Sequence, residues 1–245
     1  MAKQPRAREK APIGKRRSQN DVIDFEPSAK IVRPSFDPIK PRTDAQARYI
    51  ASIKGKHITF ATGPAGTGKT WVCASLAADA LRDKQVEKII VTRPAVEAGE
   101  SLGFLPGELE DKFSHYLTPF KEVLVERLGT GAYEYHVRMG NIEGAPLAYM
   151  RGRTFRNAIV ILDEAQNTTP EQMKMFLTRI GEGARLIING DTEQVDIRGE
   201  SGLVDAIKRI TWIPTAGHVR FAKEDVVRHG VIQEILEAYA AKEAA

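Results

Sequence analysis

The stretch from Thr62 to Thr70 reads TGPAGTGKT and constrains the fold more than any other part of the sequence. The apolar run Ile58–Ala61 precedes it, and the helix-forming run Trp71–Ala78 follows it. A strand, a glycine-rich loop and a helix with the spacing G-x-x-x-x-G-K-[ST] form a P-loop. A glycine-rich turn could match this pattern by chance, but the flanking strand and helix make that alternative the weaker one. We therefore predict a binding site for a nucleoside triphosphate.

The chemistry of phosphate binding explains the residue types in this loop. Glycines let the backbone turn tightly enough for successive N–H groups to face the phosphates. The N-terminus of the following helix adds a partial positive charge. Lys69 can then reach the β- and γ-phosphates, and the Thr70 hydroxyl can bind Mg²⁺. We expect the nucleotide to contact Gly63, Pro64, Ala65, Gly66, Thr67, Gly68, Lys69 and Thr70.

The composition excludes several classes of protein. At 245 residues, of which 42% are hydrophobic and 28% charged, the chain can form one ordinary domain or two small ones. The single cysteine, Cys73, rules out a disulfide framework. Apolar runs stay far below the 18 or so residues of a membrane span, and the N-terminus lacks the apolar segment of a secretory signal. We expect a cytoplasmic protein that does not enter a membrane.

The net charge of +4 is concentrated at the N-terminus. Residues 1–20 contain seven Lys or Arg and one Glu, a local charge of +6, which leaves −2 for the other residues. We predict that residues 1–40 form a basic, mostly disordered tail and that residues 41–245 form the folded domain. The tail could anchor nucleic acid non-specifically or serve only as a solubilising terminus.

Apolar strand-like runs alternate with helical patterns along the rest of the chain. This alternation predicts an α/β fold, a single P-loop NTPase domain with a mostly parallel sheet flanked by helices. The region from Thr130 to Arg153 shows neither pattern, and we expect it to be loop-rich. The expected strands are Ile58–Thr62, Lys88–Thr92, Ala158–Asp163, Arg185–Asn189 and His218–Phe221, and the main expected helices are Trp71–Leu81, Pro119–Leu128, Glu171–Ile180, Val204–Ile210 and Asp225–Ala241.

Two acids follow the apolar strand Ile159–Leu162. A P-loop enzyme needs a carboxylate at the carboxyl end of a nearby strand to hold Mg²⁺ through water, and Asp163 fits this role. Glu164 is placed to orient or deprotonate an attacking water. Two acids after a strand are common in loops, but in the same sheet as a P-loop they favour hydrolysis over transfer to another acceptor.

A glutamine follows another apolar strand in Gly190-Asp191-Thr192-Glu193-Gln194. Gln194 could hydrogen-bond both the γ-phosphate and the attacking water and so sense which nucleotide is bound. The alternative is that the segment is only a Gly-Asp turn.

The motifs together resemble the motor core of superfamily 1 helicases, and more closely the PhoH-like family. The acids Asp163-Glu164-Ala165-Gln166 and the segment Gly190-Asp191-x-x-Gln194 carry the first resemblance. The second rests on segments that together span about Thr43 to Tyr239, although the sequence departs from the family pattern over Ser114–Glu122, where we assign no site residues. These segments are Thr92–Gly107, Pro146–Thr154, Gln172–Gly181, Ser201–Leu203 and Asp225–His229. The resemblance implies a RecA-like ATPase that uses ATP and Mg²⁺.

The resemblance also implies roles for residues outside the P-loop. Gln46 is similar to the adenine-reading glutamine of superfamily 1, although Thr43-x-x-Gln46 could equally be a helix capping box. Arg228 is similar to an arginine that contacts the γ-phosphate from a second motor domain. Because this chain has room for one such domain, Arg228 as an arginine finger would imply a ring or other homo-oligomer. Arg228 could instead cap a helix or pair with Asp225, and Arg179 is a competing candidate.

Basic residues mark two candidate contacts with nucleic acid. Arg93 lies in the segment where superfamily 1 motors contact a single strand, and Arg151, Arg153 and Arg156 form a second cluster. Arg153 could equally serve a contact between subunits. The expected function is ATP hydrolysis coupled to RNA or single-stranded DNA. The alternatives are a nucleotide-gated assembly protein, a ribonuclease, which is weaker, and a kinase, which is weaker still.

Overall fold

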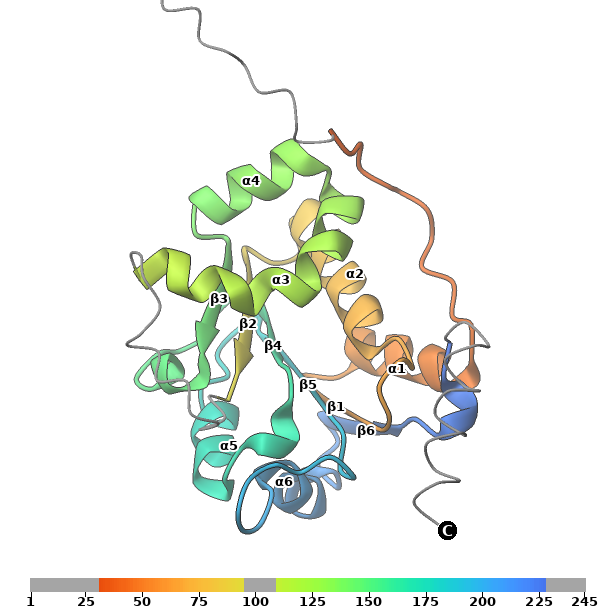
Figure 1. The fold of residues 1–245 in the computed structure, drawn as a ribbon, viewed down its shortest axis with the longest axis vertical. Coiled ribbons are helices and arrows are strands. Elements are labelled where there is room, and N and C mark those ends of the chain that lie inside the picture. The colour runs from red at the N-terminus through yellow and green to blue at the C-terminus, as the bar shows by residue number, and fades with distance from the viewer. Residues whose placement is uncertain (1–30, 95–108, 228–245) are drawn as a thin grey trace, which may run out of the picture. The chain divides into compact units, whose positions relative to one another are not determined.

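The computed structural model describes residues 31–94 and 109–227 of the chain, and residues 31–227 belong to one compact unit. Its centre is a six-stranded sheet in which every pairing of neighbouring strands is parallel, in the order β3-β2-β4-β5-β1-β6 (Figure 1). The predicted α/β class with a parallel sheet is therefore confirmed. The strands are β1 Ile58–Thr62, β2 Lys88–Arg93, β3 Ile142–Pro146, β4 Ala158–Leu162, β5 Arg185–Gly190 and β6 Ala216–Arg220.

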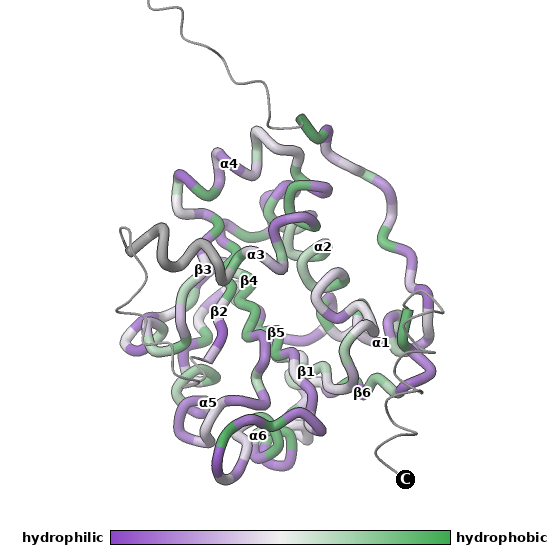
Figure 2. Tube along the Cα trace, in the orientation of Figure 1, coloured by the Kyte–Doolittle hydropathy of each residue, from purple (hydrophilic) through white to green (hydrophobic). Residues whose placement is uncertain are grey.

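Helices cover both faces of the sheet and create two apolar cores. The side chains of Ile159 and Ile161 join a core with α1, α2 and α3, whereas Val160 and Leu162 pack with α5 and α6. This alternation follows from the period of two in a strand, and β4 is apolar at every position because both faces are buried (Figure 2). The helices are α1 Asp44–Gly55, α2 Lys69–Arg82, α3 Leu109–Leu128, α4 Thr130–Arg138, α5 Pro170–Leu177 and α6 Gly202–Ile210, with short 3₁₀ helices at Leu147–Met150, Ala165–Asn167 and Lys223–Asp225.

Local signals place the helix starts. Thr169 accepts a hydrogen bond from the Gln172 N–H and Gln172 returns one to the Thr169 N–H, so α5 has the capping box expected from its sequence. At α1, Thr43 accepts from the Gln46 N–H, but the Gln46 side chain lies elsewhere, so only half of the capping-box alternative is present.

Residues 31–40, which we had placed in the tail, run in an extended conformation against the domain. The Val32 and Ser35 amides donate to Thr130 Oγ1 and to the Glu126 carbonyl. Arg127, almost completely buried, donates to the Asp37 carbonyl at 2.7 Å. Residues 1–30 lie outside the described residues, so the disordered basic tail stays a prediction for them.

The expectation of a loop-rich region from Thr130 to Arg153 is wrong, because this region contains α4 and β3. β3 is the edge strand and pairs with β2 from Ile142 to Pro146. Proline is tolerated at an edge, where the missing N–H breaks no ladder on the outer side. The helix expected from Pro119 also begins earlier, at Leu109, so Pro119 lies inside α3. Most of the helix expected over Asp225–Ala241 lies outside the described residues.

Candidate active site

A cavity of about 480 Å³ lies at the carboxyl ends of the strands. In a parallel sheet all strand ends of one kind meet at one edge, which is where ligands bind in open α/β sheets. The loops after β1, β4 and β5 all contribute to this cavity. Its lining residues are Gly63, Ala65, Gly66, Gly68, Lys69, Thr70, Trp71, Pro119, Val123, Asp163, Glu164, Gly190, Asp191, Gln194 and Val227.

The loop after β1 has the backbone conformations that a phosphate cradle requires. Gly66 and Gly68 have φ angles of 85° and 83°, a region that side chains with a Cβ rarely adopt. Thr67 is buried and donates to the Pro64 carbonyl at 3.0 Å, which fixes the turn. Gly68 is the N-cap of α2, so the unpaired amides and the dipole of this helix point at the cavity.

Lys69 begins α2 and turns its ammonium group back over the loop. Its Nζ donates to the Gly63 and Pro64 carbonyls at 2.6 and 2.9 Å and lies 5.8 Å from the centre of the Phe221 ring. Burial lowers the pKa of Lys69, while the nearby carboxylates of Asp191 and Asp163 act in the opposite direction. The ammonium is therefore held where an anionic ligand of the loop would lie.

Gln46 connects α1 to the phosphate loop. Its side chain is buried, donates from Nε2 to the Thr67 carbonyl at 3.0 Å and accepts at Oε1 from the Arg42 amide at 2.8 Å. The first bond ties the phosphate loop to α1, and the second fixes the side-chain amide of Gln46. An adenine-reading role for Gln46 stays a prediction.

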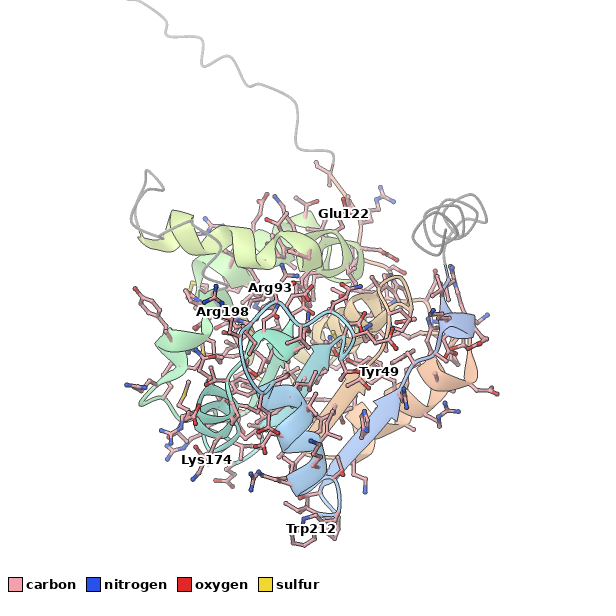
Figure 3. All side chains as sticks on the ribbon, turned by 60° about the horizontal axis from the view of Figure 1, so that its bottom comes forward. Tyr49, Arg93, Glu122, Lys174, Arg198 and Trp212 are labelled. Atoms are coloured by element: carbon pink, nitrogen blue, oxygen red, sulfur yellow. The ribbon has the colours of Figure 1, made fainter. Side chains whose placement is uncertain are left out.

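Asp163 follows β4 and is 6% exposed. Its carboxylate lines the cavity, and Oδ2 accepts hydrogen bonds from Arg93 Nε, at 3.1 Å, and from Arg93 NH2. Arg93 ends β2, the strand beside β4, so sheet register brings the two side chains together. Arg93 is among the residues labelled in Figure 3. Our assignment of Arg93 to nucleic acid did not foresee this ion pair.

Glu164 lines the cavity beside Asp163 with a φ angle of 53°, a left-handed conformation unusual for a glutamate. Its Oε2 accepts from Gln166 Nε2 at 2.8 Å. Gln166 is buried, and its Oε1 accepts from the Asp191 amide at 3.0 Å. A single amide side chain thus ties the loop after β4 to the loop after β5.

Gln194 reaches the same cavity from the loop after β5. β5 lies between β1 and β4, so the chain after it lies between the phosphate loop and the pair Asp163 and Glu164. The structure thus brings together Lys69, Thr70, Asp163, Glu164 and Gln194, which the sequence had separated by up to 125 positions.

The other basic candidates lie apart from the cavity lining. Arg151 and Arg156 are exposed, and Arg153 pairs with Glu143 of β3, with NH2 3.1 Å from Oε2. Arg228 lies outside the described residues. A role in binding nucleic acid stays a prediction for Arg93, Arg151, Arg153 and Arg156, as does the arginine finger for Arg228.

The sequence interpretation missed an apolar wall of the cavity. Trp71 of α2 is 37% exposed, and Pro119 and Val123 of α3 line the cavity with it. Trp71 directly follows Thr70, so an aromatic residue in the first turn after the loop was an available signal. Pro119 lies within Ser114–Glu122, where we had assigned no site residues.

The residues present fit a nucleotide with Mg²⁺. The left-handed glycines leave the loop amides accessible, and Thr70 and Asp163 supply the hydroxyl and carboxylate that such a metal prefers. Within the described ranges, clusters of three or more His, Cys, Asp or Glu that could hold a metal by themselves are absent.

Comparisons with known proteins bear on the whole domain. The family model described as PhoH-like protein matches residues 38–240. The chain is 54% identical over 206 residues to Protein PhoH of Escherichia coli strain K12, a match that covers 82% of this chain and 58% of the relative. It is 50% identical over 203 residues to a PhoH-like protein of Bacillus subtilis strain 168, covering 82% and 64%. The chain therefore spans about three fifths of the length of these curated relatives.

Among solved structures, the UvsW helicase of bacteriophage T4 is similar, with 12% identity, a TM-score of 0.44, and coverage of 80% of this chain and 64% of the helicase. The Pif1 helicase of Candida albicans has a TM-score of 0.38 at 16% identity, with coverage of 76% of this chain and 40% of the helicase. In the part of the chain that the structure describes, no helix is both long and apolar enough to span a bilayer.

Proposed function

This chain belongs to the PhoH-like protein family and has a P-loop NTPase fold, and from that premise we propose that it is a Mg²⁺-dependent ATPase coupled to RNA or single-stranded DNA. The observation that carries the proposal is the convergence of Lys69, Asp163, Glu164 and Gln194 on one cavity beside the phosphate loop. A metal carboxylate, a second acid and a sensor glutamine together suit the transfer of a terminal phosphate to water.

Each residue has a distinct role in this proposal. The loop amides and Lys69 bind the phosphates, and Thr70 and Asp163 hold Mg²⁺, which neutralises charge on the phosphate oxygens. Glu164 orients the attacking water and accepts its proton. Gln194 hydrogen-bonds the γ-phosphate and the water. Gln46 holds the phosphate loop through Thr67 and also contacts the adenine base of the nucleotide.

Coupling to nucleic acid rests on the family resemblance and on exposed basic residues such as Arg151 and Arg156. We also propose a homo-oligomer in which Arg228 of one subunit acts on the nucleotide of the next. The alternative function, a nucleotide-gated assembly protein, would use the same site. Its ATP turnover would not respond to nucleic acid.

The test is steady-state ATP hydrolysis with and without single-stranded RNA and DNA, with Lys69→Ala as the blank. Stimulation of several-fold by one polymer supports the coupled ATPase and identifies its polymer. Turnover that ignores both polymers supports the assembly protein. Hydrolysis equal to that of the Lys69→Ala blank contradicts both.

A further inference from the structure

The ion pair between Arg93 and Asp163 differs in geometry from the pairs that Arg153 and Arg127 form with their carboxylates. Both hydrogen bonds from Arg93 end on one oxygen, Oδ2. Arg153 by contrast donates to both carboxylate oxygens of Glu143, and Arg127 to both oxygens of Asp79. Two-oxygen pairing is the usual fit of a guanidinium to a carboxylate. Neither of these two hydrogen bonds from Arg93 uses the second oxygen of Asp163, Oδ1.

The two residues also lie differently with respect to the cavity. Asp163 belongs to the lining and Arg93 does not. The side chain of Asp163 is 9% exposed and that of Arg93 is 28% exposed. Arg93 thus reaches the carboxylate from outside the lining, and Asp163 lines the same cavity as the phosphate loop.

The backbone reinforces this arrangement. The Asp163 amide donates to the Thr92 carbonyl at 2.9 Å, which extends the pairing of β4 with β2 by one residue. The backbone positions of both residues are therefore set by the sheet. A carboxylate held by a rigid neighbour loses little rotamer entropy when it binds a further ligand.

We propose that Arg93 is a positioning residue for the metal, one that fixes Asp163 through Oδ2 so that Oδ1 is presented to the Mg²⁺ of a bound nucleotide. This inference rests on the proposed function of the same site. It assigns Arg93 a role inside the nucleotide site, in addition to any contact that its segment makes with a strand. Removal of a residue that hydrogen-bonds a metal ligand typically changes metal affinity by about 10–100-fold.

The experiment measures the affinity for the slowly hydrolysed analogue adenylyl imidodiphosphate by calorimetry, once with excess Mg²⁺ and once with EDTA. The dissociation constant in EDTA divided by the dissociation constant in Mg²⁺ gives the gain in affinity that is due to the metal. Measuring this ratio requires no turnover. We expect Arg93→Gln to lower this ratio by about 10-fold, with the EDTA value unchanged, and Arg93→Lys to restore part of it. In an Asp163→Asn background, Arg93→Gln should change nothing further, because both substitutions act through the same carboxylate.

Arg82→Gln is the matched control. Arg82 pairs with Asp79 and Asp83, its side chain is 25% exposed, and it ends α2 at the opposite end from the phosphate loop. Thermal unfolding of both variants separates a loss of stability from a loss of metal affinity.

The outcomes are distinct. An unchanged ratio in Arg93→Gln would overturn the inference and leave Arg93 a structural residue. A raised ratio would also overturn it, because Arg93 would then compete with the metal for Asp163. Additive effects in the Asp163→Asn background would contradict a shared carboxylate. If the wild-type protein binds no nucleotide at all, the proposed function fails, and this inference fails with it.

Discussion

Glu164 has a left-handed backbone conformation that is unusual for a glutamate. Its φ angle of 53° costs a non-glycine residue of order 1 kcal/mol, and the side chain is held by Gln166 at 2.8 Å. Asp163 and Glu164 both line the cavity. Strain of this kind persists where surrounding structure enforces it, as the buried Gln166 does here.

Glu164→Gln should therefore leave nucleotide affinity close to the wild-type value and reduce turnover by about 10²-fold or more, because the amide can keep the contact with Gln166 but cannot accept a proton. Dissociation constants and steady-state hydrolysis measured on the same preparation test this. Glu193→Gln is the control, since Glu193 is exposed on the loop after β5 and belongs to none of the bonds around Glu164. Wild-type turnover in Glu164→Gln would refute the assignment.

Cys73 makes stability depend on alkaline pH. Burial raises the pKa of its thiol to about 12. An unfolded thiol has a pKa of about 8.5, so the stabilisation is complete below that pH and is lost as pH rises toward the folded value. Between pH 9 and 10 the free energy of unfolding should fall by about 1.4 kcal/mol per pH unit through this group alone.

Denaturant unfolding of the wild type and of Cys73→Ala between pH 9 and 10 measures this dependence. The free energy of unfolding should fall less steeply with pH in the alanine variant, because that variant has no thiol that loses a proton on unfolding. Tyr49, whose pKa is also raised by burial, contributes at higher pH in both proteins. Equal slopes in the two proteins would show that the thiol does not titrate on unfolding.

The placement of residues in the cavity was predictable where a motif fixes chemistry and spacing together. Lys69 and Thr70 follow from the loop pattern, and Asp163 and Glu164 from their place after an apolar strand. Arg93 and Gln166 lie in the segments that carry the family resemblance, but their partners depend on the register between strands that are distant in sequence. Pairwise contacts of this kind leave no periodic signal in one chain.

At the scale of elements, β6 and the residue after it form one wall against the phosphate loop. The Phe221 amide donates to the Thr62 carbonyl at 2.7 Å, which brings its backbone against Gly63. Gly63 has a φ angle of 135°, and a Cβ there would lie 2.8 Å from Phe221 Cβ and closer still to its carbonyl. The start of the loop thus depends on a strand that follows it by more than 150 positions.

Gly63→Ala should accordingly lower stability by about 1–3 kcal/mol and weaken nucleotide binding, because both the backbone angle and the contact with Phe221 must change. Chemical denaturation and nucleotide titration test the two effects. Gly55→Ala is the matched substitution: a Cβ at Gly55 meets nothing within 4 Å and the residue ends α1. A Gly63→Ala variant as stable as Gly55→Ala would contradict this account of the loop.

Elements with strong periodicity were predicted within a few residues, and the missed ones have weak local signals. β1 has the predicted bounds, and β4 and β5 differ from theirs by one residue. β3 contains Gly144 and Pro146, which disfavour strands, and α4 begins next to Gly129 and contains Gly131. β3 is stabilised by pairing with β2, and α4 by packing on α3. Tertiary contacts therefore determine the secondary structure here, where local propensity is weak.

At the scale of the whole molecule, charge is divided between two regions of the sequence. Residues 1–20 have a charge of +6, while the remainder of the chain has −2. A net negative remainder gives little general attraction for a polyanion, so exposed arginines such as Arg151 and Arg156 would have to act locally. Binding of a nucleic acid should then depend strongly on the N-terminal residues.

Removal of residues 1–20 should weaken binding of single-stranded RNA or DNA and flatten its salt dependence, because fewer counterions are released from the phosphates. Each phosphate contact adds about 0.7 to the slope of log affinity against log salt for a single strand, so loss of four to six contacts should lower the slope by roughly 3–4. Fluorescence anisotropy with a labelled oligonucleotide from about 50 to 200 mM salt measures this. ATP hydrolysis without nucleic acid should be unchanged, since the site lies wholly within the folded domain. An unchanged slope would make these residues a solubilising terminus and would leave any affinity for nucleic acid to the arginines of the domain.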